Sequence, residues 1–230
     1  MKKSSLPTRK ECLAIIKEYH VPSHIAKHSL TVAKLAVFLA QRLTEKGITV
    51  DVNLVDRACL LHDIVRICDF KELDYGRFEQ TVTAENKAKW QQLRAKYKET
   101  PHEYAACDIL KDKFPVLALT IKKHRYIGIL NEKEKPNTWE EKLVYYADMR
   151  VMHDKIVLLE ERLTEAHKRN VNFYKTEAQR LSTIAKVDPL IYSLEKEIFD
   201  EIGLKPLEIT DEFIDSFSVT DNCFNRRGIE

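Results

Sequence analysis

Glycine is scarce in this chain, and this limits the folds open to it. Only five of the 230 residues are glycine, and the pairs Asn-Gly and Asp-Gly are absent. Because those pairs form the tight turns of β-hairpins, their absence favours helices over antiparallel sheets. With 44% hydrophobic and 32% charged residues, the chain can bury a sizeable core.

Apolar residues recur with helical spacing, and turn residues mark the helix ends. One helix is predicted over residues 24–43 and ends near Gly47. Asp51 or Asn53 can cap the next, whose apolar stripe covers residues 54–65.

Two capping boxes add further helix starts. One spans residues 100–103 with proline at the first helical position, and the other spans residues 138–141 before the run KLVYYADMRV. Pro115 opens a short helix between them.

The domain organisation follows from composition. Residues 71–100 are polar and could form a solvated insertion or a cover over a site. A helix is predicted near residues 84–98, and its charged stretch, residues 85–98, is expected to face solvent. Residues 1–155 form the core, and residues 156–230 form a helical extension, interrupted at Asp188-Pro189, that packs on the core or forms a dimer surface. The predicted fold is therefore an all-α bundle with additional C-terminal helices.

Charge and cysteine content narrow the function classes. The net charge of +2 gives no general reason to expect nucleic-acid binding, and no stretch approaches the roughly 20 apolar residues of a membrane span. None of the cysteines has CxxC spacing, so free thiols in a reducing cytoplasm are expected. These cysteines are Cys12, Cys59, Cys68, Cys107 and Cys223.

The stretch LLHDIVRICDF, residues 60–70, places His62 and Asp63 directly after an apolar run. The pair could mark the edge of a buried face or could point together at a metal ion. The other candidate ligands decide between these interpretations. Each lies on a separate helix-forming segment, a common way to build a metal site in a helical core. They are His28, His102, His124 and Asp148.

A histidine beside an apolar stripe is usually structural, so the argument depends on the set and its order. His24 lies four residues before His28 and could chelate a metal with it, but the favoured position is a solvent-facing helix N-terminus. Imidazoles together with carboxylates suit Fe, Mn, Co, Ni or Zn and argue against Mg or Ca.

The order His28, His62-Asp63, Asp148 resembles the HD superfamily of metal-dependent phosphohydrolases. The additional pair His102 and His124 resembles the two-metal branch, which includes the bacterial hydrolases of symmetrical dinucleoside tetraphosphates. The motifs LLHDI, H-x-x-x-A at His102 and YYAD are similar to theirs. The resemblance covers roughly residues 20–155.

The resemblance implies an HD helical bundle that holds one or two divalent transition metal ions and hydrolyses a nucleotide or a related small phosphate ester. His28, His62, Asp63 and Asp148 would hold the first ion. His102 and His124 would hold the second, with Asp63 bridging the two and positioning the attacking water.

Cations near the ligands are candidates for binding the substrate phosphate. Arg66 follows His62 by one helical turn and is also assigned to catalysis. The others are Lys123, Arg125 and Arg150. Arg66 and Arg150 could instead form salt bridges, with Asp69 and Glu141 respectively.

Two departures from the family pattern bear on the substrate. The chain has HDIVR where relatives often have HDIGK, and HRYIGI lacks the HHE and GYP elements of cyclic-dinucleotide phosphodiesterases. Two alternatives stay open: an inactive metal- or nucleotide-binding regulatory module, and a phosphodiesterase acting on a cyclic or short oligonucleotide. The expected partner is a small phosphate substrate, with a homodimer possible and no membrane or long nucleic acid expected.

Overall fold

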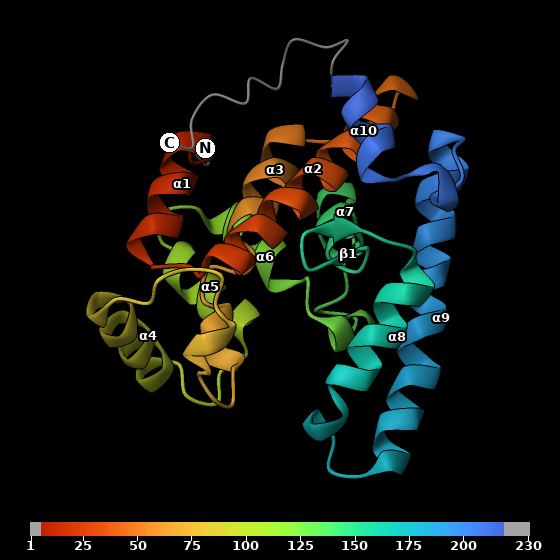
Figure 1. The fold of residues 1–230 in the computed structure, drawn as a ribbon. Helices are drawn as coiled ribbons and strands as arrows, with labels where there is room; N and C mark the ends of the chain where they lie inside the picture. Colours follow the sequence, from red (N-terminus) through yellow and green to blue (C-terminus); the bar gives the residue numbers. More distant parts are fainter. Residues whose placement is uncertain (1–5, 219–230) are drawn as a thin grey trace.

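The computed structural model describes residues 6–218, and these are almost entirely helical (Figure 1). The ten α-helices within them are α1 (Arg9–Glu18), α2 (Ser23–Glu45), α3 (Val52–Leu61), α4 (Ala84–Lys96), α5 (His102–Leu110), α6 (Pro115–Lys122), α7 (Trp139–Asp148), α8 (Leu159–Arg169), α9 (Glu177–Ile202) and α10 (Asp211–Ser218). The short 3-10 helices are η1 (Arg66–Asp69), η2 (Tyr75–Arg77), η3 (Tyr126–Leu130), η4 (Val171–Phe173) and η5 (Pro206–Glu208). The all-helical prediction is confirmed, apart from a small antiparallel hairpin of β1 (Val151–Met152) and β2 (Lys155–Ile156).

Helix α2 forms the centre of the bundle and packs against α3 and α7. Its buried side chains include Val32, Leu35 and Leu39, which have no exposed surface. The helix ends at Lys46, and Gly47 follows with the positive φ of 86° that glycine adopts without strain. Asp51 caps α3 by accepting a hydrogen bond from the Leu54 amide, as one of the two predicted caps requires.

The two predicted capping boxes have different outcomes. The box at Thr138 and Glu141 is present at the start of α7. The one at residues 100–103 is wrong, because Pro101 occupies the N-cap position and no residue of the box caps the helix. Instead the Asp69 carboxylate reaches across from η1 and accepts the His102 amide at 3.1 Å.

The insertion is less solvated than its composition indicates. Helix α4 buries Trp90 and Leu93, and Tyr97 follows on the same face. Trp90 also donates its indole N–H to the His20 carbonyl oxygen at 2.7 Å. The charged residues of the helix, such as Lys87 and Lys96, are exposed as predicted. The opposite, apolar face packs on η1 and so lies beside the segment that follows His62.

The C-terminal helices pack on the bundle through α9, which contacts α2, α7 and η3. The predicted interruption at Pro189 is wrong, because α9 runs continuously through it. Val187 and Ile191, on either side of the proline, are fully buried and hold the helix against the core. Figure 1 shows α8 and α9 as neighbouring rods at one side of the molecule, and a hydrogen bond from His167 to Asp188 joins them.

Two further sequence predictions concern thiols and membranes. Cys12, Cys59, Cys68 and Cys107 are free thiols, and Cys223 lies outside the described residues. Among residues 6–218, no helix combines the length and the apolar character that crossing a bilayer requires.

Candidate metal centre

Five helices bring the six predicted ligands to one place. His28 lies in the second turn of α2, and Asp148 is the last residue of α7. His62 and Asp63 follow the end of α3 directly, His102 is the first residue of α5, and His124 comes two residues after α6. All but two of these side chains are buried, and His28 and Asp148 are only slightly exposed.

Asp148 and Asp63 connect the first group of candidate ligands. Asp148 Oδ1 lies 3.0 Å from His28 Nε2 and 3.6 Å from His62 Nε2. Asp63 Oδ2 lies 3.6 Å from the same His62 nitrogen. Each of these contacts joins two atoms that could bind the same ion.

The other oxygen of Asp63 faces the second group. Asp63 Oδ1 lies 2.9 Å from His102 Nε2, which is 3.0 Å from His124 Nε2. The short connection between α5 and α6 brings the start of one helix next to the end of the other. The Asp63 carboxylate therefore stands between two groups of imidazoles, as a bridging ligand does.

The outer nitrogens of three histidines are bound to backbone carbonyls. His28 Nδ1 lies 2.8 Å from the His153 oxygen, His62 Nδ1 lies 2.7 Å from the Cys59 oxygen, and His124 Nδ1 lies 2.5 Å from the Ile121 oxygen. A carbonyl oxygen can only accept, so Nδ1 carries the proton in each ring. The lone pair of Nε2 then faces the centre, as metal ligation requires.

Asp69 orients the fourth histidine, and sequence reasoning missed it. Asp69 Oδ2 accepts from His102 Nδ1 at 2.6 Å, while Oδ1 accepts from the His102 amide at 3.1 Å. Arg66 donates to the same carboxylate at 2.8 Å, so it forms the salt bridge that was one of its two expected roles. The available signal was the place of Asp69 inside LLHDIVRICDF, six residues after Asp63.

The donor set fits a transition metal. His62 Nε2 is buried and has no hydrogen-bond partner, which is costly unless something else satisfies it. Two atoms that bind one ion from about 2.0–2.2 Å lie about 2.9–3.6 Å apart, and the distances above fall within this range. Neutral imidazoles with carboxylates match Fe, Mn, Co, Ni or Zn.

The histidines and carboxylates shift each other's pKa values. Burial opposes charge on Asp63 and Asp148, but the surrounding imidazoles hold both carboxyl pKa values well below their usual range. Burial likewise opposes charge on His102, yet Glu103 and Asp63 raise its pKa to about 10. Burial and the charges of His62 and His102 lower the pKa of His124 to about 4. The metal-free centre therefore holds protons that a bound ion must displace.

The remaining predicted cations are placed differently. Arg150 is fully buried, and its guanidinium donates to Tyr146, to Glu195 and to backbone carbonyls that include Val157. Its expected phosphate contact is corrected to a structural role, because no part of its side chain is accessible. Lys123 is ion-paired with Glu141 at 2.8 Å.

Two other predicted residues lie beside aromatic rings. Arg125 lies over the Tyr104 ring at 5.9 Å. His24 is half-buried and stacks on Phe78, with ring centroids 5.3 Å apart, so it does not simply face solvent as predicted.

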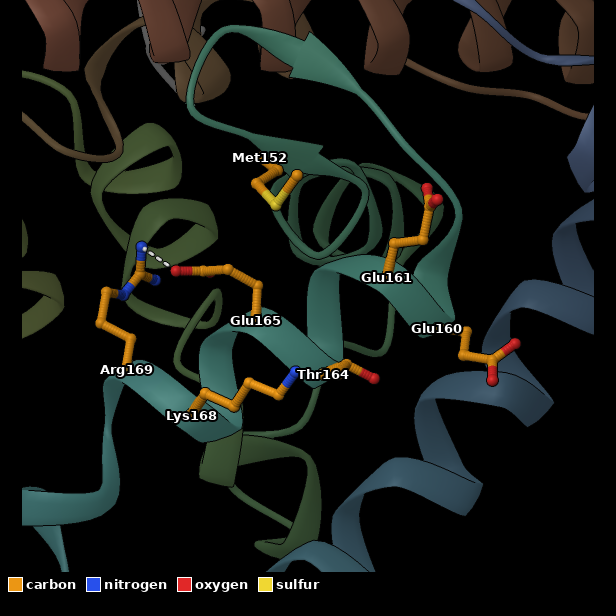
Figure 2. Close-up of a pocket in the computed structure, with 7 residues that line it drawn as sticks. All are labelled: Met152, Glu160, Glu161, Thr164, Glu165, Lys168 and Arg169. Carbon is orange, nitrogen blue, oxygen red and sulfur yellow. Dashed lines mark ion pairs between the residues drawn. The ribbon is translucent and has the colours of Figure 1, made fainter.

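One cavity among the described residues includes none of the six candidate ligands. Its volume is about 730 Å³, and it is formed by Met152 together with residues of α8 (Figure 2). The residues from α8 are Glu160, Glu161, Thr164, Glu165, Lys168 and Arg169. The carboxylates of Glu160, Glu161 and Glu165 would repel a phosphate group from most of this cavity. Arg169 is the residue of its lining that is suited to bind phosphate.

A helical bundle that gathers a buried His/Asp cluster from five helices defines the HD class of domain. The HD domain family model matches residues 25–151, more than half of the chain and a range that contains all six candidate ligands. The chain belongs to this family. No curated protein and no solved structure matches it.

Proposed function

We propose that this protein is a metal-dependent phosphohydrolase of small phosphate esters, with nucleotides as the substrate class. One observation carries the proposal. The Asp63 carboxylate stands between two groups of imidazoles, with His62 Nε2 3.6 Å from one oxygen and His102 Nε2 2.9 Å from the other. In HD domains such a buried His/Asp cluster is consistent with phosphate ester hydrolysis.

The proposed centre holds two ions, as in the two-metal branch of the superfamily. His28, His62, Asp63 and Asp148 would hold the first, and His102 and His124 would hold the second with Asp63. Ions bound there would supply Lewis acidity to the phosphoryl group and to an attacking water. The second ion is expected to bind more weakly, because fewer protein ligands hold it.

The residues of the chain have separate roles in this proposal. Asp63 orients the water through its carboxylate, and Asp148 and the imidazoles fix the geometry around it. Arg66 keeps donors beyond the one bound to Asp69, and its side chain is 30% exposed, so it can bind a phosphate oxygen. Near-neutral net charge is consistent with a small substrate and not with long nucleic acid. A homodimer remains a proposal, and light scattering tests it.

Metal reconstitution followed by a phosphate-release screen tests the function. The protein is loaded separately with Mn, Fe(II), Co, Ni, Zn and Mg and incubated with a panel of nucleotides. Hydrolysis is expected with one or more transition metals. Asp63→Ala should lose both bound metal and activity, by about a thousandfold, while its far-UV spectrum stays helical.

Asp108→Ala is the matched control, because Asp108 is a half-exposed carboxylate on α5 that pairs with Lys111. It should keep metal and activity. Full turnover by metal-free Asp63→Ala protein would contradict the proposal. A correctly loaded protein that hydrolyses nothing in the panel would favour the metal-binding regulatory module.

A further inference from the structure

One face of α8 carries an alternating array of charges. Arg162, Glu165 and Arg169 recur at helical spacing, so they lie along the same side of the helix. Glu165 bridges the two arginines, with Oε2 3.4 Å from Arg162 and Oε1 3.3 Å from Arg169. One carboxylate thus serves two guanidinium groups, which leaves the array with an excess positive charge.

The C-terminal extension is hydrogen-bonded to two segments of the HD domain that directly follow residues of the metal centre. Arg162 donates its Nε proton to the Val151 carbonyl oxygen at 2.8 Å, three residues after Asp148. Beyond the end of α8, in η4, the Asn172 carbonyl oxygen accepts a hydrogen bond from Lys71 at 2.9 Å. Lys71 lies two residues after Asp69. These two hydrogen bonds attach α8 to the segment after Asp148 and η4 to the segment after Asp69.

Arg169 is the last residue of α8. Burial is the largest cause that lowers its pKa, followed by the charge of Arg162. The charge of Arg66 lowers the pKa further, and that of Asp148 raises it. The charges of Arg66 and Asp148 therefore both act on the Arg169 guanidinium, so the end of α8 is electrostatically coupled to the metal centre.

The Arg169 side chain is available to a ligand. It is 46% exposed, and its ion-pair partner is Glu165, which it shares with Arg162. Figure 2 shows the guanidinium extending from α8 on the side away from α9, while the neighbouring Lys168 points in another direction. If Arg169 turned toward an anion, Glu165 would keep Arg162 as a partner and no charge would be left unpaired.

We propose that Arg169 is a second phosphate-binding arginine, which holds the substrate from the C-terminal extension while Arg66 holds it from the HD domain. This inference rests on the proposed phosphohydrolase function and gives the extension a part in its site. Arg66 is paired with Asp69, and Arg169 shares Glu165 with Arg162, so both keep N–H donors for a ligand. A planar guanidinium binds a phosphate group through two parallel hydrogen bonds.

Binding of inorganic phosphate to the Mn-loaded protein tests the inference without requiring turnover. Calorimetry is carried out on the unmutated protein, Arg169→Ala, Arg169→Lys and Lys168→Ala. Arg169→Ala should weaken phosphate binding at least tenfold at unchanged manganese content and melting temperature. Arg169→Lys should retain part of the affinity, because it keeps the charge and loses the planar fork.

Lys168→Ala removes the same charge from the next residue, on another face of α8, and should change the affinity less than twofold. Equal phosphate affinity in Arg169→Ala and the unmutated protein would overturn the inference, and so would an unmutated protein that binds no phosphate. If Arg169→Ala does not fold, an unweakened Arg169→Lys protein would overturn it too.

The two proposals can fail separately. Phosphate binding that depends on Arg169, in a protein that hydrolyses no nucleotide, would support the Arg169 site and refute the phosphohydrolase. Nucleotide hydrolysis that proceeds at unchanged KM and kcat in Arg169→Ala would support the enzyme and refute the Arg169 site.

Discussion

Each histidine of the metal centre has one nitrogen committed to an oxygen, and this decides which nitrogen can bind an ion. For His28, His62 and His124 the acceptor is a backbone carbonyl, which no substitution removes. For His102 the acceptor is the Asp69 carboxylate. Asp69 is therefore the one of these partners that mutation can test.

Asp69→Ala is expected to weaken the second ion about 10–100-fold, the usual cost of removing a partner that orients a metal-bound histidine. Asp69→Asn should cost less, because its amide oxygen can still accept from His102. Chelator competition measures the affinity of each ion. Asp108→Asn, on the same helix as His102, serves as the control and should bind metal normally. An unchanged second affinity in Asp69→Ala would show that the ring is fixed by packing alone.

The protons held by the centre predict how metal affinity depends on pH. Although burial opposes their charged forms, neighbouring carboxylates raise the pKa of His62, and that of His102 to about 10, in the metal-free protein. His124 is already neutral near pH 7, since its pKa is lowered to about 4. Metal binding must therefore release a proton from His102, and raising the pH removes this competition.

Between pH 6.5 and 8, affinity should rise about tenfold per pH unit for each proton displaced. Calorimetry in buffers of different ionisation enthalpy measures the protons released. In His102→Ala the remaining ion should show a shallower dependence. An affinity that does not change over this range would mean that the site is deprotonated before metal arrives.

The clustering of the six candidate ligands could be predicted from the sequence, because residue type, order and helix boundaries were enough to select them. The roles of Asp69 and Arg150 could not be predicted, because they depend on the direction of a side chain across elements. Arg150 adjoins a ligand along the chain, yet its guanidinium is turned to Tyr146 and Glu195. Arg150 and Asp148 are therefore close along the chain, but their side chains point to different parts of the molecule.

Among the elements, α5 and α6 pack against each other and are joined by a short connection. Their opposed ends place His102 Nε2 and His124 Nε2 3.0 Å apart. In the two-metal proposal this pair holds the second ion with Asp63, and His124 also lies close to His62 and Asp148 of the first group. We therefore expect His102→Ala and His124→Ala each to lower the metal content from two equivalents toward one and to cut activity at least a hundredfold.

His62→Ala should instead disturb the first ion, which distinguishes loss of one site from general unfolding. Metal analysis of reconstituted protein gives the stoichiometry. One equivalent in the unmutated protein, together with full activity in both helix-pair variants, would return the centre to the one-metal class.

Helix α9 shows where element prediction failed. Pro189 cannot donate to the carbonyl of Ala185, so local rules predict an interruption. Tertiary contacts outweigh that loss. Val187 and Ile191 are fully buried, and Asp188 accepts from Tyr126 at 2.6 Å and from His167 at 2.8 Å. These contacts come from residues distant in sequence, so periodicity alone could not show them. The burial of Trp90 and Leu93 on the apolar face of α4 was not predicted for the same reason.

At the scale of the whole molecule, the metal centre is a cross-link between helices. Its candidate ligands come from or directly adjoin α2, α3, α5, α6 and α7. The C-terminal extension packs on the same bundle through α9. A bound ion thus ties together elements that span most of residues 23–148. In the metal-free protein four carboxylates lie in this centre, and the groups that offset their negative charge are the imidazoles and Arg66. The four carboxylates are Asp63, Asp69, Glu103 and Asp148.

Metal loading is therefore expected to stabilise the entire fold. An ion present at about 100 times its dissociation constant adds about 2.7 kcal/mol to the free energy of unfolding. For a chain of this size that corresponds to a melting temperature about 5–10 °C higher. Differential scanning calorimetry with Mn and then with EDTA measures the shift, and Asp63→Ala should show little of it. Because the unfolded chain lacks the assembled site, a shift near zero would mean that the ion does not bind the folded protein in preference to the unfolded chain, which would contradict a metal centre formed by these five helices.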